Sequence, residues 1–382
     1  MTAAAALALR GWSVQVHERA DQIRATGSGI YVAENGIRVL EALGADKLAL
    51  AEGLRFYRRE TRDNRNRVIA TMRWTPESPQ RIYVLSRETL VRALQAVCTS
   101  AGVRLRLGSV VTGASEDGTI RLASGEHFKA DLVIGADGVN SAVRDSLNFQ
   151  GSRRKLSGGA IRAIVPRRDT DQDLPPHTFA EYWTGPRRVF YSPISTRETY
   201  IALMTVESDT VGTRDPVDYD AWISSFPYLE GVISRIENPL RWTSFEQIKL
   251  PRWSRGKVAL IGDAAHAMAP NLGQGGGTAV MDGISLAANV SLPDLTLDQA
   301  LARWERRERP IVNRIQRLSY VYGTLCDWPD LPRRFALNLL GRSSWAYQLR
   351  MSAANFIPDG VPGAAGDGRV ELSNDSESPM LR

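Results

Sequence analysis

The sequence is poor in the residues that build metal centres and disulfide frameworks. Its 382 residues include two cysteines, Cys98 and Cys326, and four histidines. The cysteines stand far apart in segments of helical character, so neither a zinc-binding spacing nor a disulfide network is indicated. We therefore predict no metal site and expect a reducing cytoplasm as the location.

Long apolar runs and clusters of basic residues are also missing. No run approaches the roughly 20 apolar residues of a membrane span, so we expect no transmembrane segment. The formal net charge is +6, but only five of the 48 basic residues are lysine and the arginines are dispersed. No zinc-finger, RNP or basic-zipper pattern accompanies them, so nucleic acid is not an expected partner. With 43% hydrophobic and 24% charged residues, the chain can form two folded domains.

A phosphate-binding loop is the last absence. Residues 12–19 alternate as a strand and end near Glu18, where dinucleotide-binding folds place an acidic residue on a ribose 2′-OH. The glycine fingerprint G-x-G-x-x-G should stand about 20 positions earlier. Residues 1–10 instead have the pattern of a helix, without a strand or glycine loop before it. We expect a start codon placed too far downstream or a truncated gene, and weaker cofactor binding by the chain as it stands.

The most informative segment that is present is residues 256–277. Residues 258–261 predict a buried strand, which Gly262 and Asp263 close with a turn. Asp263 would then lie at the carboxyl edge of the strand, where ligands bind in open α/β folds. Glycines at 273, 275, 276 and 277 let main chain approach a ligand without a Cβ, and a helical pattern resumes at Thr278. This arrangement suits a flavin.

Two other segments combine a strand or helix with polar turn residues. Residues 130–144 contain an apolar strand at 132–134, a turn at Asp137-Gly138, and a helix that Ser141 can cap and that carries Arg144. Residues 85–94 predict a helix with Ser86 as its N-cap and Arg87 at its start.

These segments resemble the motifs of the FAD-dependent aromatic hydroxylases, the single-component flavoprotein monooxygenases related to p-hydroxybenzoate and salicylate hydroxylase. The matching patterns are Gly-Asp-Ala-Ala-His-x-x-x-Pro-x-x-Gly-Gln-Gly at 262–275, Asp-Gly-x-x-Ser-x-x-Arg at 137–144 and Arg-x-x-Leu-x-x-x-Leu at 87–94. The resemblance spans roughly residues 1–325. It implies FAD as the cofactor and NADH or NADPH as the co-substrate. The cofactor-binding residues it implies are Glu18, Arg87, Asp137, Gly138, Arg144, Gly262, Asp263, Pro270, Gly273, Gln274, Gly275 and Gly276.

The resemblance also implies an activity. The enzyme would hydroxylate a small phenolic or ring-acid aromatic substrate with NAD(P)H and O₂ through a flavin hydroperoxide. None of the four histidines lies near residues 27–31, where some relatives carry a catalytic one. His177, Tyr182 and Tyr191 fall on predicted substrate-domain segments and are the candidate catalytic groups, although a structural role competes for each. An oligomer is compatible with the sequence.

Two other functions stay open. The same motifs occur in enzymes that epoxidise or hydroxylate polycyclic or isoprenoid substrates. An N-terminally truncated, inactive paralogue that does not hold FAD is the other alternative.

The expected fold is α/β, with a Rossmann-like FAD-binding domain that lacks its first strand and glycine loop, an antiparallel β-sheet substrate domain and C-terminal helices. We assign residues 1–54, 84–150 and 250–325 to the FAD-binding domain, and 55–83 and 151–249 to the substrate domain. Residues 326–357 form a C-terminal helical segment, in which 331–357 predict one amphipathic helix, packed on the body or lying at a partner or membrane surface. Gly, Asp, Ser and Pro dominate 358–382, which predicts a disordered tail.

Overall fold

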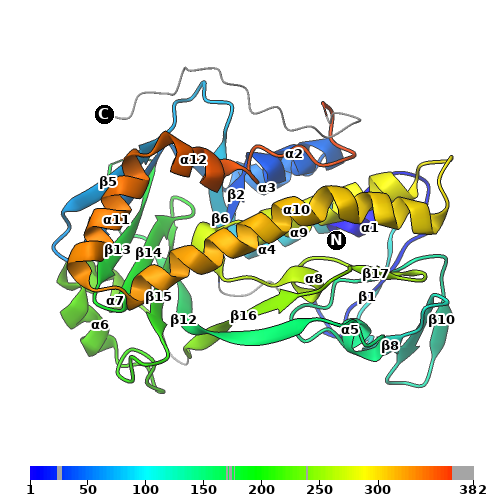
Figure 1. Cartoon of the computed structure of the whole chain (residues 1–382), viewed down its shortest axis with the longest axis horizontal. Helices are drawn as coiled ribbons and strands as arrows, with labels where there is room; N and C mark the ends of the chain where they lie inside the picture. The colour runs from blue at the N-terminus through cyan, green and yellow to red at the C-terminus, as the bar shows by residue number, and fades with distance from the viewer. Residues whose placement is uncertain (24–27, 169–170, 172–173, 176, 238–239, 364–382) are drawn as a thin grey trace.

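In the computed structural model, a large sheet lies on one side of the molecule and an α/β part on the other, and the long helix α10 (Leu297–Thr324) runs along both (Figure 1). The model describes residues 1–23, 28–168, 171, 174–175, 177–237 and 240–363. The predicted fold class is confirmed. The division of the chain at residues 54, 84, 150 and 250 stays a prediction.

The large sheet has seven strands in the order β16-β12-β15-β14-β13-β4-β5. Its pairs are antiparallel except β4 with β13, which run parallel. The hairpin β4–β5 forms this edge of the sheet and comes from an earlier part of the chain. The strands are β4 (Arg58–Asp63), β5 (Val68–Arg73), β12 (Ser152–Pro166), β13 (Thr178–Thr184), β14 (Arg187–Pro193), β15 (Glu198–Val206) and β16 (Thr243–Lys249).

Side chains alternate between the two faces of this sheet, as a period of two requires. On β14, Val189 and Tyr191 point into a core completed by Trp222 and Phe226. That core lies under α6 (Tyr219–Ser225), the short helix η2 (Pro227–Leu229) and α7 (Glu230–Ile233). Phe190 belongs to the opposite face, which turns towards the α/β part.

Within the described ranges of the chain, the α/β part contains four small sheets. Strands β11 (Val133–Gly135) and β18 (Val258–Leu260) pair in parallel, and β17 (Ser254–Arg255) pairs with β18. Strands β1 (Gln15–His17) and β7 (Arg104–Arg106) form a second parallel pair. Among the described residues, no strand joins these two pairs. The other sheets are β8 (Val111–Ala114) with β9 (Thr119–Leu122) and β10 (His127–Lys129), and β2 (Gly29–Ala33) with β6 (Ile82–Ser86) and β3 (Leu54–Arg55).

Helix α9 (Gly275–Val290) lies at the centre of the α/β part, because most of its side chains are apolar or small and buried. A Cβ on Gly283 would lie 2.8 Å from the amide nitrogen of Ala3, so only glycine lets α1 (Thr2–Ala8) approach it this closely. A capping box between Thr296 and Gln299 begins α10. The remaining helices here are α2 (Glu34–Leu43), α3 (Asp46–Ala51), α4 (Arg87–Ser100), α5 (Ala142–Ser146), α8 (Asp263–His266) and η3 (Pro270–Leu272).

The C-terminal segment differs from the single helix predicted for 331–357. It forms η4 (Leu325–Asp327), α11 (Asp330–Arg342) and α12 (Ser344–Met351). The break falls at Ser343, whose extended backbone ends α11 and whose side chain accepts from the Ala346 amide to cap α12. Residues 358–363, which the sequence assigned to the tail, pack on the body, where Val361 is buried and Asp359 pairs with Arg307 at 3.0 Å. Residues 364–382 lie outside the described residues.

Candidate functional site

The two acidic turns predicted from the sequence lie side by side at one edge of the small parallel sheet. Strands β11 and β18 pair with Gly135 opposite Leu260, and the Ile261 amide donates to the Gly135 carbonyl over 3.0 Å. Asp137 and Asp263 follow these strands, and both side chains are exposed. Because parallel strands end at the same edge, the structure brings both carboxylates to the place where open α/β sheets bind ligands.

Arg144 ties the two turns together from inside the protein. It lies in the helix that Ser141 caps, and it is only 6% exposed. Its guanidinium donates to the Ala264 carbonyl at 3.2 Å and to the Val139 carbonyl at 3.0 Å. Loss of Arg144 would therefore disturb the positions of Asp137 and Asp263.

A buried ion pair supports the turn that presents Asp263. Gly262 has φ +58° and ψ −141°, a conformation that glycine adopts far more readily than other residues. The Asp282 carboxylate on α9 accepts from the Gly262 amide at 3.0 Å and is hydrogen-bonded to Nε2 of His266. Burial alone would lower the pKa of His266, but the charge and hydrogen bond of Asp282 outweigh it and the pKa is raised. The carboxylate of Asp282 thus favours the charged form of the imidazole.

A second buried carboxyl group, Glu308 on α10, stands near this pair. It is fully buried, and neither of its carboxyl oxygens has a hydrogen-bond partner within the described part of the chain. Burial, followed by the negative charge of Asp282, raises the pKa of Glu308 to about 8. Glu308 is therefore protonated at neutral pH.

The glycine-rich entrance to α9 packs against β2. Gly273 has φ +68°, and a Cβ there would lie 3.2 Å from the ring of Tyr31. A Cβ on Gly276 would lie 2.7 Å from Ile30. At Gly275, by contrast, the nearest atom to an added Cβ is 3.9 Å away. Two of these glycines thus permit packing within the protein, while Gly275 borders open space.

Two polar or exposed groups complete this entrance. The Gln274 side chain is only 4% exposed, yet its Oε1 has no hydrogen-bond partner among the described residues. Pro270 begins η3 and is exposed. A buried acceptor without a donor is costly unless a ligand or water supplies one.

Arg87 lies near the glycine-rich entrance. Its amide donates to the Ser28 carbonyl at 3.0 Å, and its side chain is exposed at the start of α4, which Ser86 caps. Burial raises the pKa of the Tyr200 hydroxyl, and the nearby positive charges of Arg162 and Arg87 lower it by less, so the pKa stays above its ordinary value. Arg87 thus stands between α4 and the large sheet.

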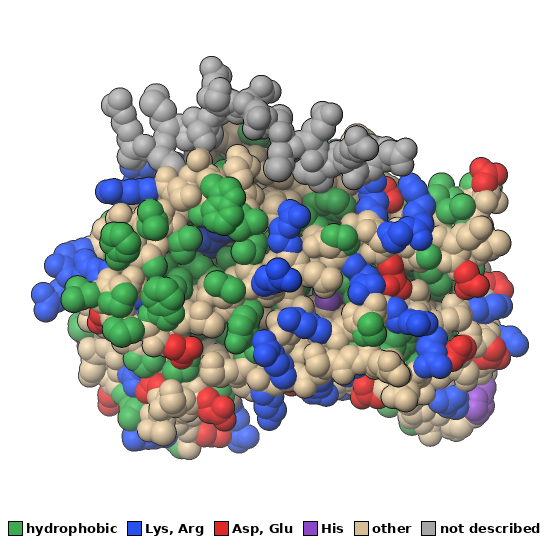
Figure 2. Space-filling model, viewed as in Figure 1, with side chains coloured by type: hydrophobic (Ala, Val, Ile, Leu, Met, Phe, Trp, Pro, Cys, Tyr) green, Lys and Arg blue, Asp and Glu red, His purple; other side chains and the backbone are tan. Residues whose placement is uncertain are grey.

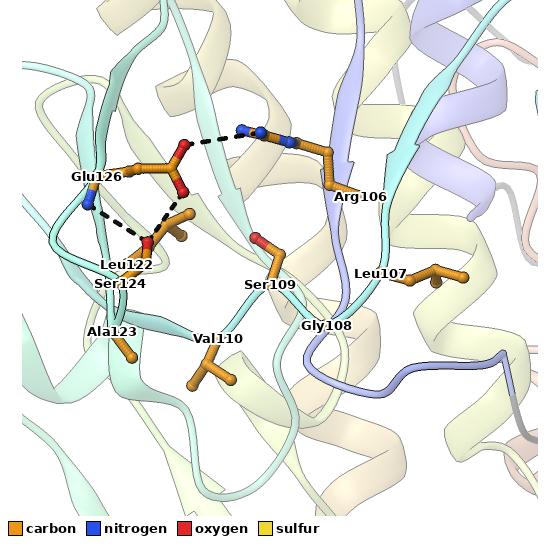
Figure 3. Close-up of a pocket in the computed structure, with 9 residues that line it drawn as sticks. All are labelled: Arg106, Leu107, Gly108, Ser109, Val110, Leu122, Ala123, Ser124 and Glu126. Atoms are coloured by element: carbon orange, nitrogen blue, oxygen red, sulfur yellow. Dashed lines mark hydrogen bonds and ion pairs between the residues drawn. The ribbon is translucent and has the colours of Figure 1, made fainter.

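Glu18 lies apart from these groups, at the end of β1. Its amide donates to the Arg106 carbonyl at 2.9 Å, and its carbonyl accepts from the Ser109 amide at 2.8 Å. A hollow of about 180 Å³ opens beside this pairing, lined in part by Arg106, Ser109 and Glu126 (Figure 3). This is smaller than the roughly 300–1,000 Å³ of ordinary small-molecule pockets. None of the lining residues belongs to the segments 135–144 or 262–277.

The face of the large sheet that looks towards the glycine-rich entrance is apolar and aromatic. Phe190 and Tyr200 have ring centroids 5.8 Å apart, and Tyr200 lies so close to Gly29 that a Cβ there would be 2.7 Å from its ring. Both pack on a cluster that includes Ala269, directly before η3. The buried members of that cluster are Leu156, Ala160, Ala202, Met204, Phe245 and Ala269.

Arg188 is a buried cation on this apolar face. It is 2% exposed and donates to Asn271 Oδ1 of η3 at 2.6 Å. Its Nε and Nη1 have no hydrogen-bond partner among the described residues. Two unpaired donors on a buried charge are unfavourable, so they favour an acceptor supplied by a ligand. Arg188 was not among the residues predicted from the sequence, although strand alternation places it on the same face as Phe190.

A buried ionic network continues from Arg188 to the C-terminal helices. Glu181 accepts from Arg59 at 2.7 Å and from the Tyr322 hydroxyl at 3.0 Å. Burial would raise the pKa of Glu181, but Arg59 and then Arg188 lower it to about 2. Arg350 of α12 lies over the Tyr322 ring at 5.3 Å. Three arginines thus surround one carboxylate, which leaves an excess of positive charge beside η3.

The three candidate catalytic groups lie elsewhere. His177 is exposed with φ +56°, and its Nδ1 is 2.9 Å from the Arg55 carbonyl. Tyr182 and Tyr191 belong to the core under α6 and α7, on the sheet face opposite to Arg188. The structure therefore does not bring any of them together with the flavin-motif residues.

These observations fit a flavin. Exposed Asp137, Asp263 and Arg87, open space at Gly275 and the orphaned Gln274 oxygen are features that a bound flavin could satisfy. No group of three or more His, Cys, Asp or Glu that could hold a metal occurs among the described residues. In the same part of the chain, no helix is both long and apolar enough to cross a bilayer.

Comparison with known proteins agrees with this geometry. The model of the FAD binding domain family matches residues 1–317. A Rhodococcus erythropolis protein, provisionally named a 2-heptyl-3-hydroxy-4(1H)-quinolone synthase, is 39% identical, over 94% of both chains. The synthase of that name from Mycobacteroides abscessus is 37% identical, over 90% of this chain and 92% of its own.

Among solved structures, the tetrameric form of 2-methyl-3-hydroxypyridine-5-carboxylic acid oxygenase superposes with a TM-score of 0.82. It is 35% identical and covers 93% of both chains. The chain therefore belongs to the family that carries this FAD binding domain, and it is an FAD-dependent monooxygenase of aromatic substrates.

Proposed function

We propose that the enzyme hydroxylates an oxygen-bearing nitrogen heterocycle with an apolar side chain, of which a 2-alkyl-4-quinolone is the model compound. The observation that carries this proposal is Arg188, a buried cation with two unpaired donors set in a wall of apolar and aromatic side chains. A ring carbonyl or hydroxyl oxygen would accept from Arg188, and the wall would take the ring and its alkyl group. The names of the relatives support this substrate class, because a synthase of a 3-hydroxyquinolone must act on the ring that lacks this hydroxyl.

The residues of the chain would bind, orient and exclude water. Asp263, Asp137, Gly138 and Arg87 would hold the ribityl and phosphate parts of FAD, and Glu18 its adenosine ribose. The helix entrance at 273–276, with Pro270 and Gln274, would lie against the ring system. FAD, once bound, supplies hydride acceptance from NADH or NADPH and the activation of O₂.

The pocket residues would then place the substrate. Phe190 and Tyr200 would stack against its ring, while Arg188 would stabilise the deprotonated form of the ring oxygen, and this anionic form is more nucleophilic at the neighbouring carbon than the neutral one. The apolar and aromatic side chains around the substrate would keep water away from the reacting atoms. We infer a cytoplasmic location for this reaction, because NAD(P)H is the co-substrate.

A ring carboxylic acid is the second candidate. The excess of positive charge formed by Arg59, Arg188 and Arg350 around Glu181 favours it, since a carboxylate would balance that charge. The solved relative bears such a substrate in its name.

The test begins with the full chain loaded with FAD and freed of unbound flavin. Oxidation of NADH and of NADPH is followed with 2-heptyl-4-quinolone, with the same ring lacking the heptyl group, and with a hydroxypyridine carboxylic acid. The reaction is run under ¹⁸O₂, and the product is analysed by mass spectrometry. We expect one labelled oxygen in the heptyl quinolone product and the highest kcat/KM for that compound.

Two results would contradict the proposal. Labelled product from the ring acid alone would establish the second candidate. Both substrate classes would be refuted if the protein retains its flavin spectrum and oxidises NAD(P)H, but no aromatic compound gives a labelled product.

A further inference from the structure

The outer surface of the two C-terminal helices carries an exposed apolar stripe. On α11, Leu331, Phe335 and Leu339 follow one another at every fourth residue and are 81%, 73% and 58% exposed. Trp345 on α12 is 72% exposed and Trp328 before α11 is 45% exposed. Figure 2 shows hydrophobic side chains gathered over α11 and α12 on this face. We call these five residues the α11–α12 stripe.

The fold itself does not need this stripe. Helix α11 attaches through its other side, where Leu337 and Arg333 are buried. Leu337 packs with Leu325 and Tyr322 beneath the helix. Contiguous apolar patches of this kind are uncommon on proteins that bind nothing there, since their exposure to water is unfavourable.

Basic side chains stand beside the stripe. On α10, exposed Arg314 and Arg317 precede exposed Val321 along one side of the helix, at spacings of three and four residues. Figure 2 shows a row of Lys and Arg side chains along α10 that leads to the apolar area. Neither Arg314 nor Arg317 makes an ion pair or hydrogen bond within the described residues, and the same holds for exposed Arg342 at the end of α11.

Acidic groups do not neutralise these arginines. Asp330 at the start of α11 is bound by Arg333 and accepts from the Gly185 amide at 3.2 Å. Asp327 is exposed near the same end. Arg314, Arg317 and Arg342 therefore leave a positive charge beside the stripe, which a negatively charged partner surface would complement.

We propose that α11 and α12 dock on an anionic lipid surface, with the stripe inserted at the level of the headgroups and the arginines against the phosphates. Helices that lie in a membrane interface combine Trp, Phe and Leu on one face with arginine beside it. A second copy of the chain is a poorer occupant, because a twofold contact through the stripe would bring like charges together. With no spanning helix among the described residues, this docking is peripheral.

The position of α12 also connects the proposed lipid-binding surface to the aromatic cluster near the proposed substrate site. Met351 of α12 and Ala354, just after this helix, belong to the cluster that contains Phe179, and Tyr31 and Tyr347 pack against it. Only this step rests on the proposed function: a lipophilic substrate dissolved in the bilayer would reach the enzyme on the side where its ring is bound. The docking itself is independent of the substrate.

Vesicle sedimentation tests the proposal. The FAD-loaded full chain is mixed with vesicles of equal parts phosphatidylglycerol and phosphatidylcholine, or of phosphatidylcholine alone. We expect sedimentation with the anionic vesicles only, and its loss at high salt. The double variant F335S/L339S should partition at least about tenfold more weakly, and R314Q about fivefold more weakly. The matched control is L48S, because Leu48 is 57% exposed on α3.

Light scattering of the same samples identifies a different occupant. If the wild-type chain is an oligomer that F335S/L339S dissociates, and no vesicle binding occurs, the stripe is an interface between copies and the proposal fails. The proposal also fails if the full chain does not bind the vesicles and only a variant that ends at residue 363 binds them. It fails too if L48S weakens vesicle binding as much as F335S/L339S does. Flavin absorption and unfolding temperature show that each variant is folded.

Discussion

Asp282 on α9 is hydrogen-bonded to the imidazole of His266 and, through the same oxygen, accepts from the Gly262 amide. Helix α9 is thereby joined to both ends of the turn that carries Asp263. Asp282 and His266 are 0% and 3% exposed, so water does not compete for these bonds. The pair is a positioning device for the predicted flavin contacts.

The substitution D282N tests this role. An amide keeps the shape of the side chain but removes its charge, so the His266 imidazole and the Gly262 amide lose a negatively charged acceptor. A hydrogen bond to a charged group contributes about 1.5–3 kcal/mol, which predicts FAD binding about 10- to 100-fold weaker. Flavin fluorescence titration measures the affinity.

The midpoint potential of the bound flavin distinguishes a positioning role of Asp282 from a merely structural one. If Asp282 positions the flavin contacts, the potential should shift in D282N, because the charge next to the turn that carries Asp263 changes. If Asp282 only stabilises the fold, the potential should stay the same. The variant S285A, on the same buried face of α9, is the control. An unchanged potential and an affinity loss equal to that of S285A would contradict the positioning role.

Gly275 offers a test of where the flavin lies. Outside the neighbouring residues of its own helix, the nearest atom to an added Cβ would be 3.9 Å away. Gly275 is also the first residue of α9, where alanine is as favourable as glycine or more so. The substitution G275A should leave the unfolding temperature of the FAD-free protein unchanged or raise it. FAD affinity should nevertheless fall about tenfold or more, because the methyl group would occupy the space of the ring system. Equal affinities for both proteins would show that the flavin does not approach Gly275.

The sequence predicted the local parts of the site and the order of its elements. Asp137 and Asp263 each follow a short apolar strand, and such strand-turn patterns depend on neighbouring residues alone. Their proximity then follows from the parallel pairing of β11 and β18. The motif residues themselves stay predictions until flavin binding is measured.

The contacts that complete the pocket could not be predicted in this way. Arg188 meets Asn271 across 83 positions, and Arg59 meets Glu181 across 122. The first distance is closed by the packing of the large sheet against η3, and the second by the pairing of β4 with β13 within the sheet. No short sequence pattern encodes either arrangement. The break at Ser343 was missed for another reason, since the apolar pattern of 331–357 continues through it and only the serine cap ends α11.

Arg188 should act on the substrate rather than on the flavin. The substitution R188M keeps an apolar side chain of similar length and removes the two unpaired donors. We expect KM for the aromatic substrate to rise about 10- to 100-fold, as for the loss of one hydrogen bond to a charged group, with FAD affinity unchanged. The control is R154M, because Arg154 lies on β12 and donates to Gln247. A loss of FAD with an unchanged KM would move Arg188 from the substrate side to the cofactor side.

Glu308 should make the protein less stable as the pH rises. Its carboxyl has a pKa of about 8 when folded and an ordinary value of 4.5, so between these values the unfolded chain releases a proton that the folded protein keeps. The unfolded state therefore binds fewer protons, and stability falls from pH 4.5 to pH 8 by at most roughly 5 kcal/mol. The substitution E308Q removes this term and should raise the unfolding temperature at pH 8 but not at pH 4.5. Since His266 also has a raised pKa, its contribution to stability is lost in the same direction above its ordinary value of 6.5, and E308Q keeps that contribution. Denaturant titrations at several pH values measure both slopes, and parallel profiles for the wild type and E308Q would mean that Glu308 is ionised in the folded protein.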